Sequence, residues 1–194
     1  MKLVIIKYNA GNIQSVSFAL ERLGIDFMIT DEKEAIQKAE KVIFPGVGEA
    51  STTMHYLRDK KLDSVIRDLK QPVLGICLGM QLMCKYSEEN DTSCLGIFDE
   101  SVKRFIPEGD LKVPHMGWNQ LNLKDSWLNP ALENQNAYFV HSYFVPVNPY
   151  TSAVTHYIHS FSAAMHRDNF YAVQFHPEKS AKAGELVLKS FLDL

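Results

Sequence analysis

Short apolar runs alternate with amphipathic helical patterns through the first half of the chain. The runs predict buried strands at residues 3–6, 27–29, 42–44 and 73–76. Apolar residues at helical spacing predict one helix between Asn12, a plausible N-cap, and Gly24, and another around residues 62–69. A polar helix candidate separates the second and third strands. Strands and helices that alternate in this way predict an α/β fold with a mostly parallel sheet and helices on its faces.

The second half has a different pattern. Residues 152–158, 161–166 and 169–175 predict successive strands, and a closing helix is expected after Pro177. A further helical pattern runs from Met80 to about Tyr86, and Cys84 would lie on it. We interpret residues 1–194 as one α/β domain that carries additional antiparallel strands.

Composition excludes several classes of protein. Twenty basic and 23 acidic residues give a formal net charge of −3, which argues against a strong field for nucleic acid. The three cysteines form no CxxC pair, and His156 and His159 lie three apart on one predicted strand, so neither set suggests a metal site. No apolar run approaches the ~20 residues that a membrane-spanning helix needs. We expect a cytoplasmic protein that binds no nucleic acid, membrane or metal.

The run Gly75-Ile76-Cys77-Leu78-Gly79 lies between a predicted strand and a helical pattern. This is the G-x-nucleophile-x-G elbow with Cys in place of Ser, in which the glycines permit a tight turn that exposes the nucleophile. Cys77 at the start of a helix would favour the thiolate. A buried structural cysteine beside two packing glycines is the alternative.

His176-Pro177-Glu178 follows the last predicted strand directly. Residues i and i+2 of an extended segment project to the same side, so the Glu178 carboxylate is placed to orient the His176 imidazole. A thiol, a base and an orienting carboxylate are the groups of acyl transfer. A surface His and Glu that flank a turn proline are the alternative.

The segment Phe44-Pro45-Gly46-Val47-Gly48 also follows a predicted strand. Its glycines let the backbone approach a ligand and turn N–H groups inward. We expect Val47 and Gly48 to supply oxyanion-hole donors together with the N–H of Leu78. A phosphate loop is disfavoured because neither GxGxxG nor GxxxxGK[ST] occurs.

Together these three segments resemble the class I (triad) glutamine amidotransferases, and the resemblance runs from about Lys2 to the C-terminus. It implies a flavodoxin-like three-layer fold and no cofactor. It also implies that Cys77 attacks the glutamine amide, that His176 protonates the departing ammonia and that Glu178 orients His176. Water then hydrolyses the glutamyl thioester. The substrate-binding positions carried over from the family are Gly46, Gly48, Gln81, Ser142 and Tyr143.

Within this family the chain is most similar to the glutaminase subunits of imidazole glycerol phosphate synthases. The similarity rests on Gly11-Asn12, on the runs 114–119 (PHMGWN) and 138–143 (YFVHSY), and on 176–180 (HPEKS). It implies a heterodimer with a (β/α)₈-barrel cyclase that receives the ammonia. A partner-induced peptide flip at residues 45–48 would activate the glutaminase. The partner-interface positions carried over are Asn12, Trp118, Tyr138 and Lys179.

Three alternatives to this function stay open. One is a glutaminase that serves another synthase, against which the PHMGWN run argues. A second is a catalytically idle regulatory relative, against which the intact set of Cys77, His176 and Glu178 argues. A third is a stand-alone thiol hydrolase, which would be active without a partner. The sequence departs from the commoner family pattern at Lys7, at Ala10 and at residues 49–51.

Overall fold

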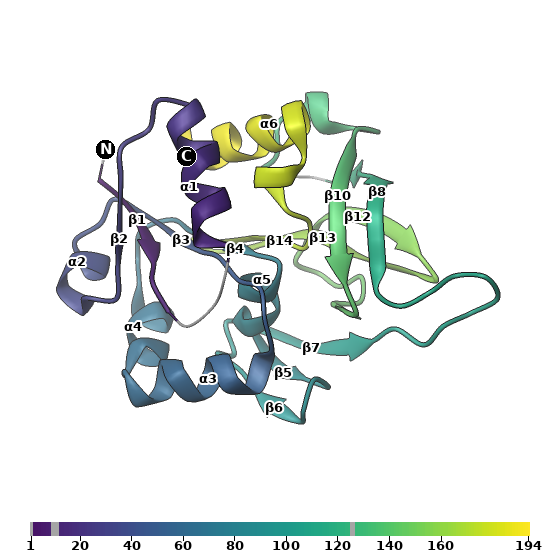
Figure 1. Ribbon diagram of the computed structural model, residues 1–194, viewed down its shortest axis with the longest axis horizontal. Helices are drawn as coiled ribbons and strands as arrows, with labels where there is room; N and C mark the ends of the chain where they lie inside the picture. The colour runs from purple at the N-terminus through teal and green to yellow at the C-terminus, as the bar shows by residue number, and fades with distance from the viewer. Residues whose placement is uncertain (1, 9–11, 125–126) are drawn as a thin grey trace.

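The computed structural model describes residues 2–8, 12–124 and 127–194, and its elements surround an eight-stranded sheet (Figure 1). In chain order the elements are β1 (Leu3–Ile6), α1 (Ile13–Arg22), β2 (Phe27–Thr30), α2 (Lys33–Gln37), β3 (Lys41–Phe44), α3 (Ala50–Asp59), α4 (Leu62–Asp68), β4 (Val73–Ile76), α5 (Leu78–Met83), β5 (Cys84–Ser87), β6 (Thr92–Ser93), β7 (Phe98–Arg104), β8 (His115–Gln120), β9 (Asn122–Leu123), η1 (Pro130–Leu132), β10 (Asn136–His141), β11 (Tyr143–Phe144), β12 (Thr151–Tyr157), β13 (His159–Arg167), β14 (Phe170–Val173), η2 (Pro177–Lys179) and α6 (Ala181–Leu192). Among these helices none has the length and hydropathy to cross a membrane.

The main sheet has the strand order β2-β1-β3-β4-β14-β13-β12-β9. Its first five strands are parallel, and the last three continue it antiparallel. The parallel part has the order of flavodoxin-like folds. Two smaller sheets pair β10 with β8 and join β11, β7, β5 and β6. The expected α/β fold with a mostly parallel sheet and added antiparallel strands is confirmed.

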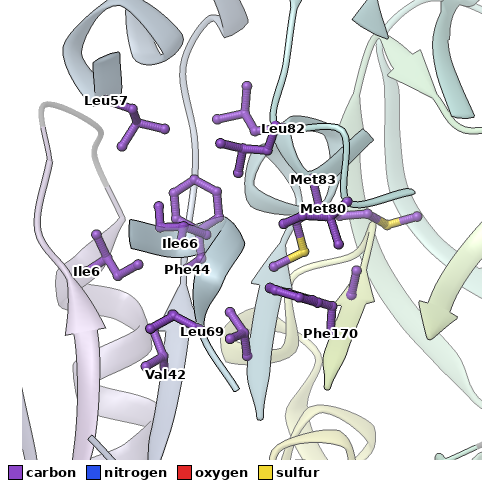
Figure 2. Packing of buried hydrophobic residues seen from close by; sticks show 14 of the residues in the cluster. Ile6, Val42, Phe44, Leu57, Ile66, Leu69, Met80, Leu82, Met83 and Phe170 are labelled. Carbon is purple, nitrogen blue, oxygen red and sulfur yellow. The ribbon is translucent and has the colours of Figure 1, made fainter. Parts of the chain in front are cut away.

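Buried apolar side chains cover both faces of the sheet. Helices α1 and α6 lie on one side of the sheet, and α3, α4 and α5 lie on the other (Figure 1). In β1, Leu3 and Ile5 belong to the cluster that includes residues of α1 and α6, whereas Val4 and Ile6 belong to the cluster that includes residues of α3, α4 and α5. Figure 2 shows the second of these clusters, in which Phe44 of β3 packs among residues of the three helices. A parallel strand that is buried on both faces has a continuous apolar sequence, and these strands could therefore be predicted from the sequence.

Two local predictions are wrong. The helix expected from Met80 to Tyr86 ends at Met83, and Cys84 begins strand β5, which pairs with β6 and β7. His156 and His159 lie on two strands, β12 and β13, because the chain turns between them at Ile158, which has φ 59°. Both strand pairings depend on residues outside the local window, so helical or alternating periodicity alone did not reveal them. Helix α3 was not predicted.

The adjacent parallel strands β3, β4 and β14 deliver three chain segments to one edge of the sheet. Residues 45–48 leave β3, residues 77–79 leave β4 and residues 174–178 leave β14, each at the carboxyl end. Ligand sites of open α/β sheets form at this edge. The three segments singled out from the sequence therefore meet in the fold.

Gly79 permits the closest of these approaches. A Cβ atom at Gly79 would overlap the carbonyl oxygen of Phe44, at the end of β3. Only glycine therefore lets α5 start against β3.

We predict that Gly79→Ala lowers the free energy of unfolding by about 3 kcal/mol, because the added methyl group forces backbone to move. Urea denaturation measures this change. Gly109→Ala is the matched control: Gly109 has φ 57°, but a Cβ atom there meets no atom of the described part of the chain within 4 Å. The control substitution is expected to cost only about 1 kcal/mol from backbone strain. Equal costs at the two positions would contradict the account.

Candidate active site

Cys77 occupies the turn between β4 and α5. Its backbone has φ 51° and ψ −107°, a left-handed conformation that is strained for any residue other than glycine. The N–H of Cys77 donates to the carbonyl of Val173 at 2.8 Å, which ties the turn to β14. The Cys77 side chain borders a cavity of about 420 Å³. The structure thus presents a single thiol at the edge where the three segments meet.

His176 and Glu178 form a buried pair beside this turn. The imidazole Nδ1 lies 2.7 Å from Oε1 of Glu178, and the two side chains are 0% and 1% exposed. The hydroxyl of Ser180 donates to the His176 carbonyl, and the His176 N–H donates to the carbonyl of Tyr138. Nε2 of His176 is buried and has no hydrogen-bond partner among the residues that the structure describes. Nε2 is therefore the ring atom that is available for proton transfer.

The environment of His176 favours its protonated form. Burial alone disfavours the imidazolium, but interactions with the Cys77 and Glu178 side chains outweigh burial and raise the pKa of His176 to about 10. At neutral pH the ring therefore carries a proton that it can deliver. The ring that carries this proton lies next to the Cys77 side chain.

Asn12 supports the same pair. Its side-chain amide donates to Oε1 of Glu178, the oxygen that also faces His176. Asn12 is the N-cap residue of α1, as the sequence predicted, and its carbonyl accepts from the N–H of Val16. Its φ is 75°, and among the described residues its side chain makes no capping hydrogen bond. Ala10 and Gly11, which the sequence analysis singled out, lie outside the described residues.

The expected oxyanion segment lies next to Cys77 in a closed conformation. The N–H of Leu78 donates to the carbonyl of Gly46 at 3.3 Å, and Val47 and Gly48 line the cavity. The hydroxyl of Tyr8, a buried residue that the sequence analysis missed, donates to the carbonyl of Pro45. One of the expected oxyanion donors is thus occupied by the segment itself.

Glu49 fixes the other end of this segment. Its carboxylate accepts hydrogen bonds from the N–H groups of Ser51 and Thr52 and caps α3. Burial opposes its ionisation, but these bonds and one from Asn90 lower the pKa of Glu49 to about 2. The departure from the common family pattern at this position therefore supplies an N-cap.

The cavity lining contains the predicted substrate residues Gly48, Gln81, Ser142 and Tyr143. Its lining consists of Val47, Gly48, Cys77, Leu78, Gln81, Glu89, Pro114, Val140, His141, Ser142 and Tyr143. Gly46 lies behind this lining, against Tyr8 and Gly79. A larger hollow of about 850 Å³ between β2, α2 and the end of α3 contains no residue singled out from the sequence. We therefore assign the chemistry to the smaller cavity.

Among the residues that the structure describes, Glu89 is the one acidic side chain in the cavity lining, and the sequence analysis missed it. Burial raises the pKa of Glu89, the N–H of Ala50 opposes this effect, and the nearby Glu49 carboxylate adds to it. No short motif marks Glu89 in the sequence. The cavity thus combines one negative group with the thiol of Cys77.

A chain of hydrogen bonds runs along the cavity wall. The carbonyl of Tyr143 accepts from Nδ1–H of His141 at 2.7 Å. In a neutral ring this leaves Nε2 of His141 as an acceptor, and it accepts from Nδ1–H of a neutral His115 at 3.1 Å. Burial lowers the pKa of His141 to about 3 and that of His115 to about 4, which keeps both rings neutral. Nε2 of His115 then accepts from the amide of Asn119 at 3.3 Å. Each ring therefore has a defined tautomer.

The four positions expected at a partner interface lie close to the His176–Glu178 pair. Trp118 is 56% exposed, and its ring contacts that of Tyr138 across the β8–β10 pair, with 5.9 Å between centroids. The ammonium of Lys179 lies 6.0 Å from the centre of the Tyr138 ring. With Asn12 bonded to Glu178, the structure brings all four residues to one side of the site.

Comparison with known proteins identifies the family. A family model described as glutamine amidotransferase class-I matches residues 4–193. The chain belongs to this family. The match covers nearly the whole chain, from β1 to the end of α6. The class-I glutamine amidotransferase resemblance noted from the sequence is confirmed, and the chain is a glutamine amidotransferase.

Relatives of this amidotransferase cover its full length. It is 60% identical to the imidazole glycerol phosphate synthase subunit HisH of Bacteroides thetaiotaomicron, with all of both chains aligned. It is 45% identical to the HisH subunit of Idiomarina loihiensis, over 100% of this chain and 98% of the relative.

Solved structures agree on the fold of this amidotransferase. A putative GMP synthase protein of Thermoplasma acidophilum superposes with a TM-score of 0.75 at 18% identity, over 100% of this chain and 93% of that one. PurLQS of Thermotoga maritima gives a TM-score of 0.67 at 15% identity, over 99% and 97% of the two chains. At these identities the likeness supports the fold alone.

We predict that Glu178→Gln lowers the pKa of His176 by about 1–3 units, because the amide removes the negative partner of the imidazolium. NMR of the ring nitrogens measures this pKa, and the His141 signals, those of a neutral ring in both proteins, are the internal control. The raised pKa of His176 also stabilises the fold, fully below about pH 6.5. This contribution is lost as the pH rises through about 10. The stability difference between the two proteins should therefore shrink over that window. A wild-type His176 that titrates near pH 6.5 would contradict the account.

Proposed function

We propose that the chain is the glutaminase subunit of an imidazole glycerol phosphate synthase, and that residues 1–194 act as one amidotransferase domain. It hydrolyses glutamine to glutamate and ammonia. It passes the ammonia to a (β/α)₈-barrel cyclase subunit, which makes imidazole glycerol phosphate and aminoimidazole ribotide for histidine biosynthesis. The observation that carries this proposal is that Cys77, which lines the cavity, interacts with His176 of the buried His176–Glu178 pair. The names of the full-length relatives and the run 114–119 support the choice of synthase.

The first half of the reaction forms a thioester. The Cys77 thiolate attacks the side-chain amide carbon of glutamine, which forms a C–S bond and moves the carbonyl electrons to oxygen. Nε2–H of His176 gives its proton to the amide nitrogen, and the C–N bond breaks to release ammonia. Glu178 holds Nδ1 of His176, so Nε2 keeps its direction toward the reacting atoms.

The second half regenerates Cys77. A water molecule gives a proton to neutral Nε2 of His176 as its oxygen attacks the thioester carbon. The C–S bond breaks, and the thiolate and the imidazolium are restored. The product leaves as glutamate after its new γ-carboxyl group gives its proton to solvent. Cys77, Cys84 and Cys94 are free thiols, the form that is usual in a reducing compartment, so we propose that the complex lies in the cytoplasm.

The closed oxyanion segment supports activation by a partner. The Gly46 carbonyl and the Val47 N–H belong to one peptide group. Rotation of this group removes the carbonyl from the Leu78 N–H and turns the Val47 N–H toward the same space. Glycine at position 46 tolerates the rotation at low cost, and Tyr8 holds the preceding carbonyl in place. We propose that the cyclase induces this flip, which completes an oxyanion hole of Leu78, Val47 and Gly48.

Glutamine carries two charged groups on its Cα, and residues around the cavity suit each of them. The Glu89 carboxylate is the partner for the α-ammonium, because it is the acidic group in the lining. Gln81 has donated its amide N–H groups to Gln174 and Tyr143, so its carbonyl oxygen is the group that remains for substrate. We assign the α-carboxylate to the Ser142–Tyr143 backbone.

The partner surface comprises Asn12, Trp118, Tyr138 and Lys179. An exposed Trp next to Tyr is typical of protein interfaces. Because Asn12 bonds Glu178 and Tyr138 bonds the His176 backbone, a cyclase docked here would act on the triad directly. We propose a heterodimer through this surface.

We predict low glutamate release from glutamine by the isolated chain and a large rise when the cyclase and its nucleotide ligand are added. Cys77→Ala in the complex should reduce release at least about a thousandfold, because the nucleophile is lost. Full activity of the isolated chain would contradict the gating and favour a stand-alone hydrolase. No glutamate release either with or without this cyclase would contradict the choice of synthase or indicate a catalytically idle relative.

We predict that Glu89→Gln raises the KM for glutamine about tenfold in the complex and changes kcat less, because the lost ion pair binds ground state and transition state alike. Steady-state glutamate release measures both constants. Glu100→Gln, on β7 outside the cavity lining, is the matched control and should leave both constants unchanged. A fall in kcat at constant KM would contradict the role given to Glu89.

A further inference from the structure

Gln174 is a buried polar residue to which the mechanism above gives no role. It lies between the end of β14 and His176, and it is 0% exposed. Its backbone N–H donates to the carbonyl of Ala163 at 2.8 Å, which extends the sheet by one residue. A glutamine buried so deeply requires partners for both ends of its side-chain amide. One of those partners is the sulfur of Cys77, at 3.6 Å from Nε2.

The hydrogen-bond network defines which end of the Gln174 amide faces Cys77. The carbonyl of Tyr143 can only accept, so the group of Gln81 that lies 2.9 Å from it is the amide nitrogen. The same nitrogen lies 2.9 Å from the Gln174 side chain, which must present its oxygen there. The nitrogen of Gln174 is then left to face the sulfur. An exchange of oxygen and nitrogen in Gln174 would set two N–H donors against each other.

The anchor of this network is itself immobilised. The Tyr143 carbonyl accepts from Gln81 and, at 2.7 Å, from Nδ1–H of His141. These two donors use both lone pairs of the oxygen. His141 is in turn held by His115, so the wall of the cavity fixes Gln81 and through it Gln174.

Two opposed groups flank the sulfur of Cys77 besides His176. The carbonyl of Val140 lies at 4.0 Å and, as an acceptor, suits only the protonated thiol. The side-chain amide of Gln174 donates a hydrogen bond to the sulfur, and a donor in this position favours the thiolate. Gln174 is therefore the uncharged group whose contact favours the reactive form.

We propose that Gln174 is a further catalytic residue of this site: its Nε2–H donates to the Cys77 sulfur, fixes the direction of the sulfur and stabilises its negative charge before attack. The inference rests on the proposed role of Cys77 as the nucleophile. Unlike His176, Gln174 transfers no proton.

The test is the rate at which iodoacetamide alkylates Cys77 in the whole chain between pH 5 and 10. Peptide mass spectrometry separates Cys77 from Cys84 and Cys94. In Gln174→Met, which keeps the size and loses the donor, the rate at pH 7 should fall about tenfold, the factor of one hydrogen bond to a charged group. The pH of half-maximal rate should move upward. An unchanged rate and an unchanged profile would overturn the proposal.

Thr155→Val is the matched control. Thr155 is fully buried, and its hydroxyl donates to the carbonyl of Gln120, away from Cys77. This variant loses a buried hydrogen bond without touching the site, so its alkylation profile should match that of the wild type. An equal slowing in both variants would mean that general loosening of the core, and not the donor, is responsible, and it would overturn the proposal.

A measurement on the unaltered protein covers the case in which Gln174→Met does not fold. The side-chain amide protons of Gln174 should shift in NMR spectra with the same pH midpoint as the alkylation of Cys77, and they should lose this response after alkylation. Amide signals that do not follow Cys77 would overturn the proposal. Neither readout requires glutamine or a cyclase, so a chain that releases no glutamate but shows the Gln174 effect would refute the proposed function alone.

Discussion

The site depends on the parallel pairing of β4 with β3 on one side and with β14 on the other. Parallel strands end at the same edge, so three segments distant in sequence are brought side by side by backbone hydrogen bonds alone. The turn at Cys77 is bonded to Val173, and Gly79 lets α5 start against the carbonyl of Phe44. A slip in either pairing would separate the thiol from the His176–Glu178 pair.

Buried polar groups around this edge are arranged in two electrostatic classes. His176, Glu178 and Asn12 form a network in which charge is favoured, because each member offers the opposite charge or a donor. His141 and His115 form a second network in which burial keeps the rings neutral. The separation matters because only the first network can move a proton at neutral pH, whereas the second holds the cavity wall. Acyl transfer is thereby confined to one histidine of three.

The sequence was most informative where local chemistry sets local structure. The apolar runs located β1, β3 and β4, because strands buried on both faces are almost wholly apolar. The glycines around Cys77 indicated the turn, and the proline between His176 and Glu178 indicated the end of a strand. The sequence could not indicate Tyr8, Glu89 or Gln174, because each acquires its role from a contact made across the fold. Strand β5 was missed for the same reason, since its pairing partners follow it in the chain.

The central claim is that Cys77 forms a covalent bond to the acyl group of glutamine. The most direct measurement is rapid acid quenching of the complex of chain and cyclase during turnover, followed by mass spectrometry of cysteine peptides. We predict one glutamyl group on the peptide that contains Cys77 and none on those of Cys84 and Cys94, because Cys77 alone of the three lines the cavity. Glutamyl transfer to either other cysteine would contradict it.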